Sequence, residues 1–173
     1  MGSATVDVNL TRLRRYAVAR SLFPARSLPA ALVTLGFVQA DPIRSPARAQ
    51  DLTLRLRVTG YRAGDLERRY RQLSLEEDFF VNYGFLTPGL HTRLHPRGGF
   101  RAWPKPGKKV ADAVLAFVRE RGEVHPRDVD AHFAHGAVTN YWGGSSSATT
   151  HVLDHLHYRG LLRVAGRDSG IRR

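Results

Sequence analysis

Apolar residues in the first hundred positions recur mostly at the spacing of amphipathic helices. Residues three, four or seven apart fall on one side of a helix, where they can pack together. This spacing predicts four helices, with these inward residues: Leu10, Leu13 and Ala17; Leu32 and Leu35; Ala49, Leu52 and Leu56; Leu66, Tyr70 and Leu73. Capping residues support the first three helices. The first follows Asn9, the second opens with Ser27 and Pro29 and ends at Gly36, and the third opens with Ser45 and Pro46.

Two segments of the same region predict strands. Residues 37–41 form a short, mainly apolar stretch that Pro42 stops, and the aromatic run at Phe79 and Phe80, followed by residues 83–87, predicts strand pairing. Because alternating aromatic residues in a strand suit a buried surface, we expect Phe79 and Phe80 to lie in the core.

Residues 103–107 read Trp-Pro-Lys-Pro-Gly and predict a linker, since two prolines and a glycine oppose regular structure. Three more helices follow, with these inward residues: Val110, Val114, Phe117 and Val118; Val129 and Phe133; Ala148, Val152, Leu153 and Leu156. Ser145 or Ser146 should cap the last helix and Gly160 should end it, before a strand at 161–166 and a turn at 167–170.

Three helices followed by a β-hairpin is the order of a winged helix. We therefore expect an α+β, mainly helical fold with two tandem winged-helix units. The first unit spans residues 1–102 and carries the candidate site, and the second spans 108–173 and is cut within its wing. We expect the last helix to present these polar residues on its outward face: Ser147, Thr149, Thr150, His151, Asp154, His155 and Arg159. This face should dock in a DNA groove, through Ser147, Thr150, His151 and Arg159. Winged helices also serve as protein-binding modules, and a solvated face is the simpler alternative.

Charge points to a polyanionic partner. The chain has 27 Lys and Arg against 15 Asp and Glu, a net charge of +12 and a pI near 11.1. Phosphates attract such a chain without sequence-specific contacts, which favours double-stranded DNA; an ordinary protein of Arg-rich composition is the alternative. The absence of Cys excludes disulfides and thiolate sites. With no apolar run that could span a bilayer and no signal-peptide pattern, we expect no membrane association and a cytoplasmic, nucleoid-associated location.

Residues 35–58, reading LGFVQADPIRSPARAQDLTLRLRV, resemble the winged-helix DNA glycosylases of the AlkZ and YcaQ type. The likeness continues through Gly60, Tyr61, Asp65 and Leu66, the aromatic run near Phe80, and residues 158–167. It implies tandem winged helices around a DNA channel, and excision of alkylated bases, in some members with unhooking of interstrand crosslinks. The family's catalytic signature, Gln then Gln or Asp two residues later, falls on Gln39 and Asp41. The chain is shorter than the family, and it has Asn82 as a possible site-lining residue where many members have His.

Positions i and i+2 of a strand project to one side, so we expect Gln39 and Asp41 to stand together. Asp41 would stabilise an oxocarbenium-like sugar or activate water, and Gln39 would orient that water. The structural alternative is that Asp41, before a proline, only starts a turn. Arg44, Arg48 and Arg55 share helical spacing and predict a phosphate-binding ridge, or else a solvated face.

The resemblance therefore implies a DNA glycosylase that excises N7-alkylated bases from duplex DNA in base excision repair, without a cofactor. Among the eight His, His151 and His155 lie four apart but lack the Glu of a His-Glu-x-x-His pattern, so no metal is expected. The main alternative is a winged-helix DNA-binding protein or transcriptional regulator without catalytic activity. A third possibility is a partial chain whose unfinished wing pairs with another chain.

Overall fold

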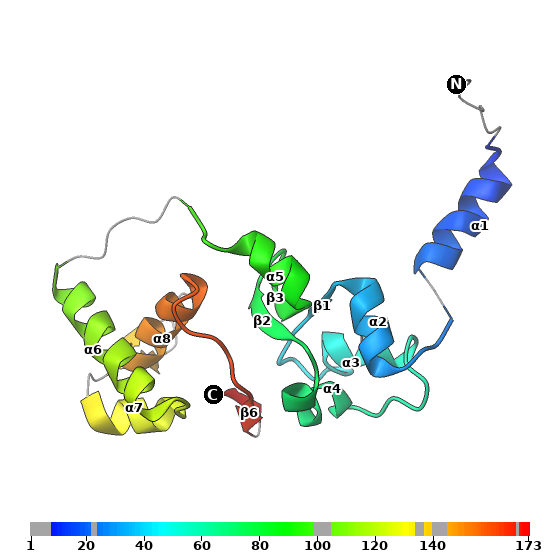
Figure 1. Cartoon of the computed structure of the whole chain (residues 1–173). Coiled ribbons are helices and arrows are strands. Elements are labelled where there is room, and N and C mark those ends of the chain that lie inside the picture. Colours follow the sequence, from blue (N-terminus) through cyan, green and yellow to red (C-terminus); the bar gives the residue numbers. More distant parts are fainter. Residues whose placement is uncertain (1–7, 22–23, 99–104, 134–136, 140–144, 169) are drawn as a thin grey trace.

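The computed structural model describes residues 8–21, 24–98, 105–133, 137–139, 145–168 and 170–173. The first part of the chain comprises α1 (Leu10–Ser21), α2 (Leu28–Leu35), β1 (Phe37–Gln39), α3 (Ala49–Arg55), α4 (Asp65–Arg68), a 3-10 helix (Tyr70–Gln72), β2 (Glu76–Phe79), β3 (Tyr83–Leu86) and α5 (Pro88–Leu94). The second part comprises α6 (Lys105–Arg121), α7 (Pro126–Phe133), β4 (Ala137–Thr139), β5 (Ser145–Ser147), α8 (Ala148–Tyr158), β6 (Arg167–Asp168) and β7 (Ile171–Arg172). The α+β, mainly helical class is confirmed (Figure 1).

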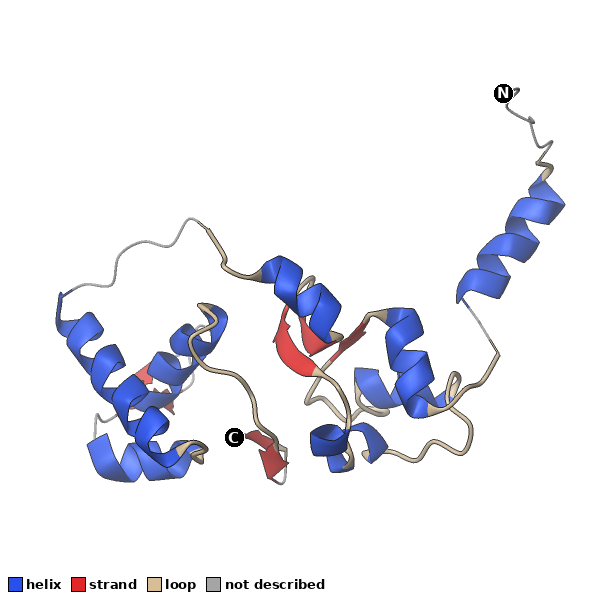
Figure 2. Ribbon diagram, in the orientation of Figure 1, coloured by secondary structure: helices blue, strands red, loops and turns tan. Residues whose placement is uncertain are grey.

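The first part is built on a small antiparallel sheet in the order β1-β3-β2 (Figure 2). Val38 and Phe85 are partners in the register and point into a core that also contains Leu28, Leu32, Leu54, Leu66 and Tyr70. Gly84 is required between the two outer strands, because a Cβ there would lie 2.4 Å from the Phe37 ring and 2.5 Å from the Val38 carbonyl oxygen. The register therefore fixes where β1 ends and the following turn begins.

The second part has its own apolar core between α6, α7 and α8, with Ala111, Val114, Phe117, Val129 and Leu156 buried. The inward residues predicted for α6 and α7 pack in this core or against it. Helix α6 begins at Lys105, inside the segment predicted as a linker, since Pro106 lies in its first turn, where a proline needs no N–H.

The C-terminal segment returns to the first part of the chain (Figure 1). Val164 packs against the first core and accepts a 3.2 Å hydrogen bond from the Tyr70 hydroxyl. Arg163 pairs with Glu76, and Arg167 forms a bidentate pair with Glu77, with N–O distances of 2.9 and 2.7 Å. Residues of the C-terminal segment thus pack against the first part of the chain and form ion pairs with it.

Several local predictions for the first part are confirmed. The Asn9 side chain accepts a hydrogen bond from the Arg12 N–H at 2.9 Å, and Gly36 ends α2 at φ +70°. The fourth predicted helix is split into α4 and the 3-10 helix, yet it buries Leu66 and Tyr70 as expected. Helix α1 forms, but none of its residues is buried, so its apolar spacing does not mark a core face.

The buried face predicted for α3 is wrong. The helix starts at Ala49, and Leu52 and Leu56 are 43% and 68% exposed, whereas Gln50 and Asp51 are buried beside Leu54. Hydrogen bonds described below satisfy Gln50 and Asp51, which makes burial of these polar groups possible.

The predicted burial of the aromatic run is also wrong. Phe79 and Phe80 are 39% and 49% exposed at the tip of the β2–β3 pair, although the strand pairing itself is as predicted. Glu76, Glu77 and Asp78 are buried instead, because Arg163, Arg167 and Arg97 neutralise them. Acidic residues are rarely buried unless paired, so these three side chains depend on their arginine partners.

Three predictions around α8 need correction. Ser145 and Ser146 do not cap the helix, because they pair with β4 in β5. Thr149, expected on the outward face, is 1% exposed. Residues 161–166 are not a strand; the hairpin instead pairs Arg167–Asp168 with Ile171–Arg172. Among the helices that the structure describes, none combines the length and apolar character that crossing a bilayer requires.

Candidate functional site

A cleft of about 480 Å³ opens where the core-facing side of the sheet ends. Its floor includes Ala40, Phe79 and Tyr83, which continue the face formed by Val38 and Phe85. Its remaining walls come from the turn after β1, from α3 and α4, from α8 and from the C-terminal segment: Asp41, Pro42, Arg44, Arg48, Gln50, Glu67, Asp154, Arg167, Gly170, Ile171 and Arg172. This volume lies within the roughly 300–1,000 Å³ typical of ligand pockets.

Asp41 lines the cleft and is held from two sides. Its backbone N–H donates to Gln50 Oε1 at 3.0 Å, and its Oδ1 accepts from the Ile43 N–H at 2.8 Å. The second contact is the turn expected for an Asp before a proline. The turn uses one carboxylate oxygen and fixes the side-chain rotamer, so the group is oriented within the cleft.

A buried ionic network lies beneath Asp41. Arg48 donates to Asp51 at 3.0 Å and to Glu67 at 2.5 Å, and Asp51 also accepts from the Tyr61 hydroxyl and the Gly64 N–H, both at 2.9 Å. Burial alone would raise the pKa of Asp51, but these hydrogen bonds outweigh it and lower the pKa below its usual 3.8. The carboxylate therefore stays ionised and ties the start of α3 to α4.

Gln50 connects this network to the cleft. Its Nε2 donates to Glu67 at 3.3 Å while its Oε1 accepts from Asp41, and the residue is 2% exposed. An amide can donate and accept at once, which a carboxylate or an amine cannot do here. Gln50 thereby sets the position of Asp41 relative to α3.

The opposite wall is formed by cations from the C-terminal segment. Arg167 pairs with Glu77, and Tyr83 donates to the same carboxylate at 3.0 Å. Arg172 lies 4.9 Å from the centre of the Tyr83 ring and pairs with Asp154 at 2.8 Å. Burial and the neighbouring Glu77 raise the pKa of Tyr83, so it remains a neutral hydrogen-bond donor.

Gln39 does not line this cleft, although Asp41 does. Gln39 is the last residue of β1 and is exposed. The structure therefore brings Asp41, but not Gln39, into the set of residues that line the cleft. Gln39 is exposed at the strand end, and Asn82 is exposed in the turn between β2 and β3, outside the residues that line the cleft.

The predicted arginine ridge is not a helical face, because Arg44 and Arg48 precede α3 and only Arg55 belongs to it. Arg44 is exposed at the cleft, Arg48 is 13% exposed in its ion pairs, and Arg55 is exposed on α3.

The residues in and beside α8 that were predicted to bind DNA have different surroundings. Thr150 lines a separate pocket of about 110 Å³ with Val118 and Leu153, while His151 and Arg159 are half-buried. Ser147 ends β5, and its side chain lies outside the described residues.

Sequence reasoning missed Gln50, Tyr83, Arg167 and Arg172 as cleft residues. The signal available for Gln50 was its place beside Asp51, two polar residues where an apolar helix face would need to continue. For the two arginines the sequence held no signal, because only the return of the C-terminal segment brings them to the cleft.

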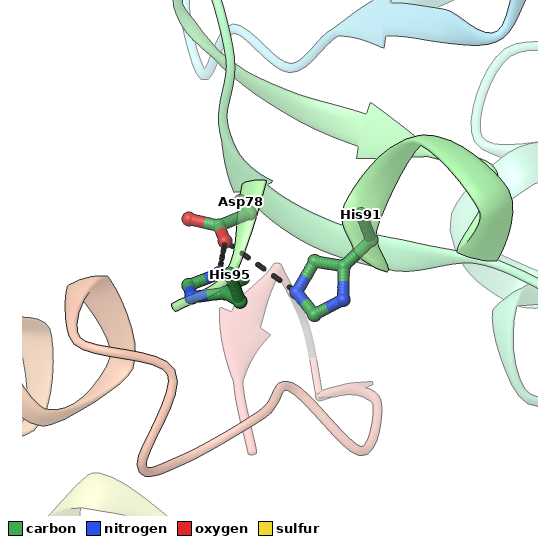
Figure 3. Close-up of side chains that lie close together, drawn as sticks. All are labelled: Asp78, His91 and His95. Atoms are coloured by element: carbon green, nitrogen blue, oxygen red, sulfur yellow. Dashed lines mark hydrogen bonds and ion pairs between the residues drawn. The ribbon is translucent and has the colours of Figure 1, made fainter. Parts of the chain in front are cut away.

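A second polar cluster lies away from the cleft, where Asp78 of β2 faces His91 and His95 at the C-terminal end of α5 (Figure 3). The Nε2 atoms of His91 and His95 lie 3.4 and 2.5 Å from Asp78 Oδ2. Burial, and then the nearby His95, lower the pKa of His91. The sequence offered a signal here too, since His91 and His95 are four residues apart.

Comparison with known proteins gives one match. The family model described as "DNA glycosylase AlkZ-like" matches residues 32–173, from α2 to the C-terminal hairpin. The matched region contains every residue that lines the Asp41 cleft. No curated protein and no solved structure matches the chain.

Proposed function

From the premise that this chain belongs to the AlkZ-like family of DNA glycosylases, we propose that it removes bases alkylated at N7 from double-stranded DNA. The observation that carries the proposal is the position of Asp41, an oriented carboxylate in a cleft whose other walls supply Arg44 and Arg172. Unhooking of interstrand crosslinks, known in some family members, is a further activity of the same chemistry.

The reaction needs little general-acid catalysis from the protein. A purine alkylated at N7 carries a positive charge, so it leaves with the electron pair of the N-glycosidic bond as a neutral base. Water then bonds to C1′ of the sugar and gives its proton to the Asp41 carboxylate or to solvent. An ionised carboxylate beside the sugar stabilises the positive charge that develops on it in the transition state.

Cations at the cleft suit the phosphates that flank such a base. Arg44 is exposed at one wall, and Arg172 enters from the C-terminal hairpin. The net charge of +12 adds a long-range attraction that weakens with salt. In this proposal the two parts of the chain act as tandem winged helices along the duplex, since α6, α7 and α8 precede the β6–β7 hairpin in the required order.

Gln39 enters the proposal as a second polar group, reached from the exposed end of β1 rather than from inside the cleft. In this proposal it meets the DNA strand or the attacking water once the duplex is bound, while Asp41 acts from the cleft. The two residues are then separable by mutation, because only Asp41 lines the cleft.

Base release distinguishes this proposal from a DNA-binding regulator without catalysis. The chain is incubated with duplex DNA carrying a single 7-methylguanine and with the same duplex unmodified, and abasic sites are revealed by alkaline cleavage. A glycosylase produces strand breaks at the modified position only. A regulator produces none and protects a preferred sequence whether or not the guanine is methylated; that result would overturn the proposal.

A further inference from the structure

The cluster of Asp78, His91 and His95 holds three metal-ligating side chains with their ligand atoms within 4.8 Å of one another (Figure 3). In the part of the chain that the structure describes, it is the one group of three such residues arranged in this way. Asp78 is buried, whereas the side chains of His91 and His95 are 17% and 16% exposed, so solvent reaches the cluster from the histidine side.

The two oxygens of Asp78 have separate partners. Oδ1 accepts from the Phe79 N–H at 2.7 Å and from Arg97 at 2.9 Å. Oδ2 faces both imidazoles, through the Nε2 atoms of His91 and His95. A carboxylate whose far oxygen is fixed by hydrogen bonds while the near oxygen points at two imidazoles has the outer support that metal-binding carboxylates require.

One separation between ligand atoms agrees with a small ion. Ligands about 2.0–2.1 Å from a tetrahedral Zn²⁺ lie roughly 3.3 Å from each other. The separation of 3.4 Å between His91 Nε2 and Asp78 Oδ2 already matches this value. The 2.5 Å separation for His95 is a hydrogen bond, and it would lengthen as the shared proton leaves and the ion takes its place.

We propose that Asp78, His91 and His95 form a binding site for a divalent first-row transition-metal ion, with Zn²⁺ as the best fit and water as its fourth ligand. Two imidazole nitrogens and one carboxylate oxygen suit Zn²⁺, and the open position is reached from solvent. Arg97 does not compete for the ion, because it binds the opposite oxygen of Asp78.

The site is separate from the Asp41 cleft, because Asp78, His91 and His95 do not line that cleft. The ion would tie β2 to α5 next to the point where α8 ends. Gly160 approaches His95 so closely there that a Cβ would lie 2.6 Å from its Nδ1, and Arg97 lies 4.5 Å from the centre of the Tyr158 ring. Metal binding would therefore stabilise the junction between the two parts of the chain.

The test uses the full chain without a histidine tag, stripped of metal and dialysed against micromolar Zn²⁺. We expect one ion per chain by elemental analysis, a rise of several degrees in the thermal midpoint, and, with Co²⁺ in place of Zn²⁺, visible absorption bands of a four-coordinate ion. The His91→Ala/His95→Ala variant should lose all three signals while keeping its helical circular dichroism.

His151 and His155 provide the matched control, since they have the same spacing on α8 but belong to no group of three ligands in the described residues. The His151→Ala/His155→Ala variant should bind Zn²⁺ like the parent chain. The proposal is overturned if the parent binds no Zn²⁺, or if the His91→Ala/His95→Ala variant binds as much. If that variant is misfolded, single His91→Ala decides, because a three-ligand site should lose at least tenfold in affinity with any one ligand.

Discussion

The side-chain carbonyl of Gln50 accepts a hydrogen bond of 3.0 Å from the backbone N–H of Asp41. This contact joins the start of α3 to the turn after β1, and a donor–acceptor chain continues it through Glu67 to Arg48. The position of the proposed catalytic carboxylate therefore depends on a residue that has no direct part in the reaction.

Replacing Gln50 with Leu removes both contacts of the amide and leaves buried polar groups without their partner. We expect the free energy of unfolding to fall by about 1–3 kcal/mol, because an unsatisfied buried group costs that much. Base release should slow in single-turnover assays while DNA affinity stays close to that of the parent. Leu52→Ala, at an exposed position of the same helix, is the control and should change stability by less than about 0.5 kcal/mol. Equal effects of the two substitutions would argue against a positioning role for Gln50.

Gly84→Ala should destabilise the sheet. The new methyl would meet the Phe37 ring at 2.4 Å and the Val38 carbonyl at 2.5 Å, and backbone cannot move aside cheaply. Overpacking of this kind costs roughly 1–3 kcal/mol, measured by urea unfolding. Gly89→Ala tests specificity, because a Cβ at Gly89 meets nothing within 4 Å. Unchanged stability of Gly84→Ala would mean that β1 and β3 do not pair in this register.

Replacing Arg48 with Ala should lower stability, whereas replacing Arg44 with Ala should weaken DNA binding. Loss of Arg48 leaves Asp51 partly buried without its cation and leaves Glu67 with only Arg167, at 3.8 Å, so we expect stability to fall by about 3 kcal/mol. Loss of the exposed Arg44 should leave the unfolding curve unchanged and weaken DNA binding, with a shallower salt dependence. Fluorescence anisotropy at several salt concentrations, together with urea unfolding, separates the two. The assignment fails if Arg44→Ala lowers stability and Arg48→Ala does not.

Asp51 should make the protein sensitive to acid. Its pKa is lower in the folded chain than the usual 3.8, so the unfolded state binds the proton more readily. The stabilisation is complete above that value and is lost as the pH falls below it. Unfolding measured between about pH 5 and pH 3 should show a shallower pH dependence for Asp51→Asn than for the parent. Identical slopes would mean that other carboxylates carry the acid sensitivity.

The sequence predicted elements well where one local rule decided the outcome. Asn9 caps α1, Gly36 ends α2, and the core positions of α6 repeat at helical spacing. Sequence patterns did not predict the burial of polar residues whose partners lie far along the chain. The pairs of Glu76 with Arg163 and of Glu77 with Arg167 span 87 and 90 positions. Helix and strand periodicity relates only residues a few positions apart, so it cannot predict such pairs.

The candidate site was predicted in part for the same reason. The resemblance of residues 35–58 identified Asp41, and the structure has this residue in a polar cleft. Strand alternation predicted Gln39 beside it, whereas Gln39 is exposed at the end of β1 and does not line the cleft. Arg167 and Arg172 could not have been found, since their contribution depends on how the C-terminal segment folds back.

Single-turnover release of 7-methylguanine by Asp41→Asn, compared with the parent chain, tests the central claim most directly. The substitution keeps the shape and the oxygen that accepts from Ile43, but removes the negative charge. We predict that the rate falls by at least about a hundredfold, as for loss of a strong electrostatic contact in a transition state, with unchanged DNA affinity and thermal midpoint. A variant that releases the base at the parent rate would contradict the assignment of Asp41 as the catalytic carboxylate.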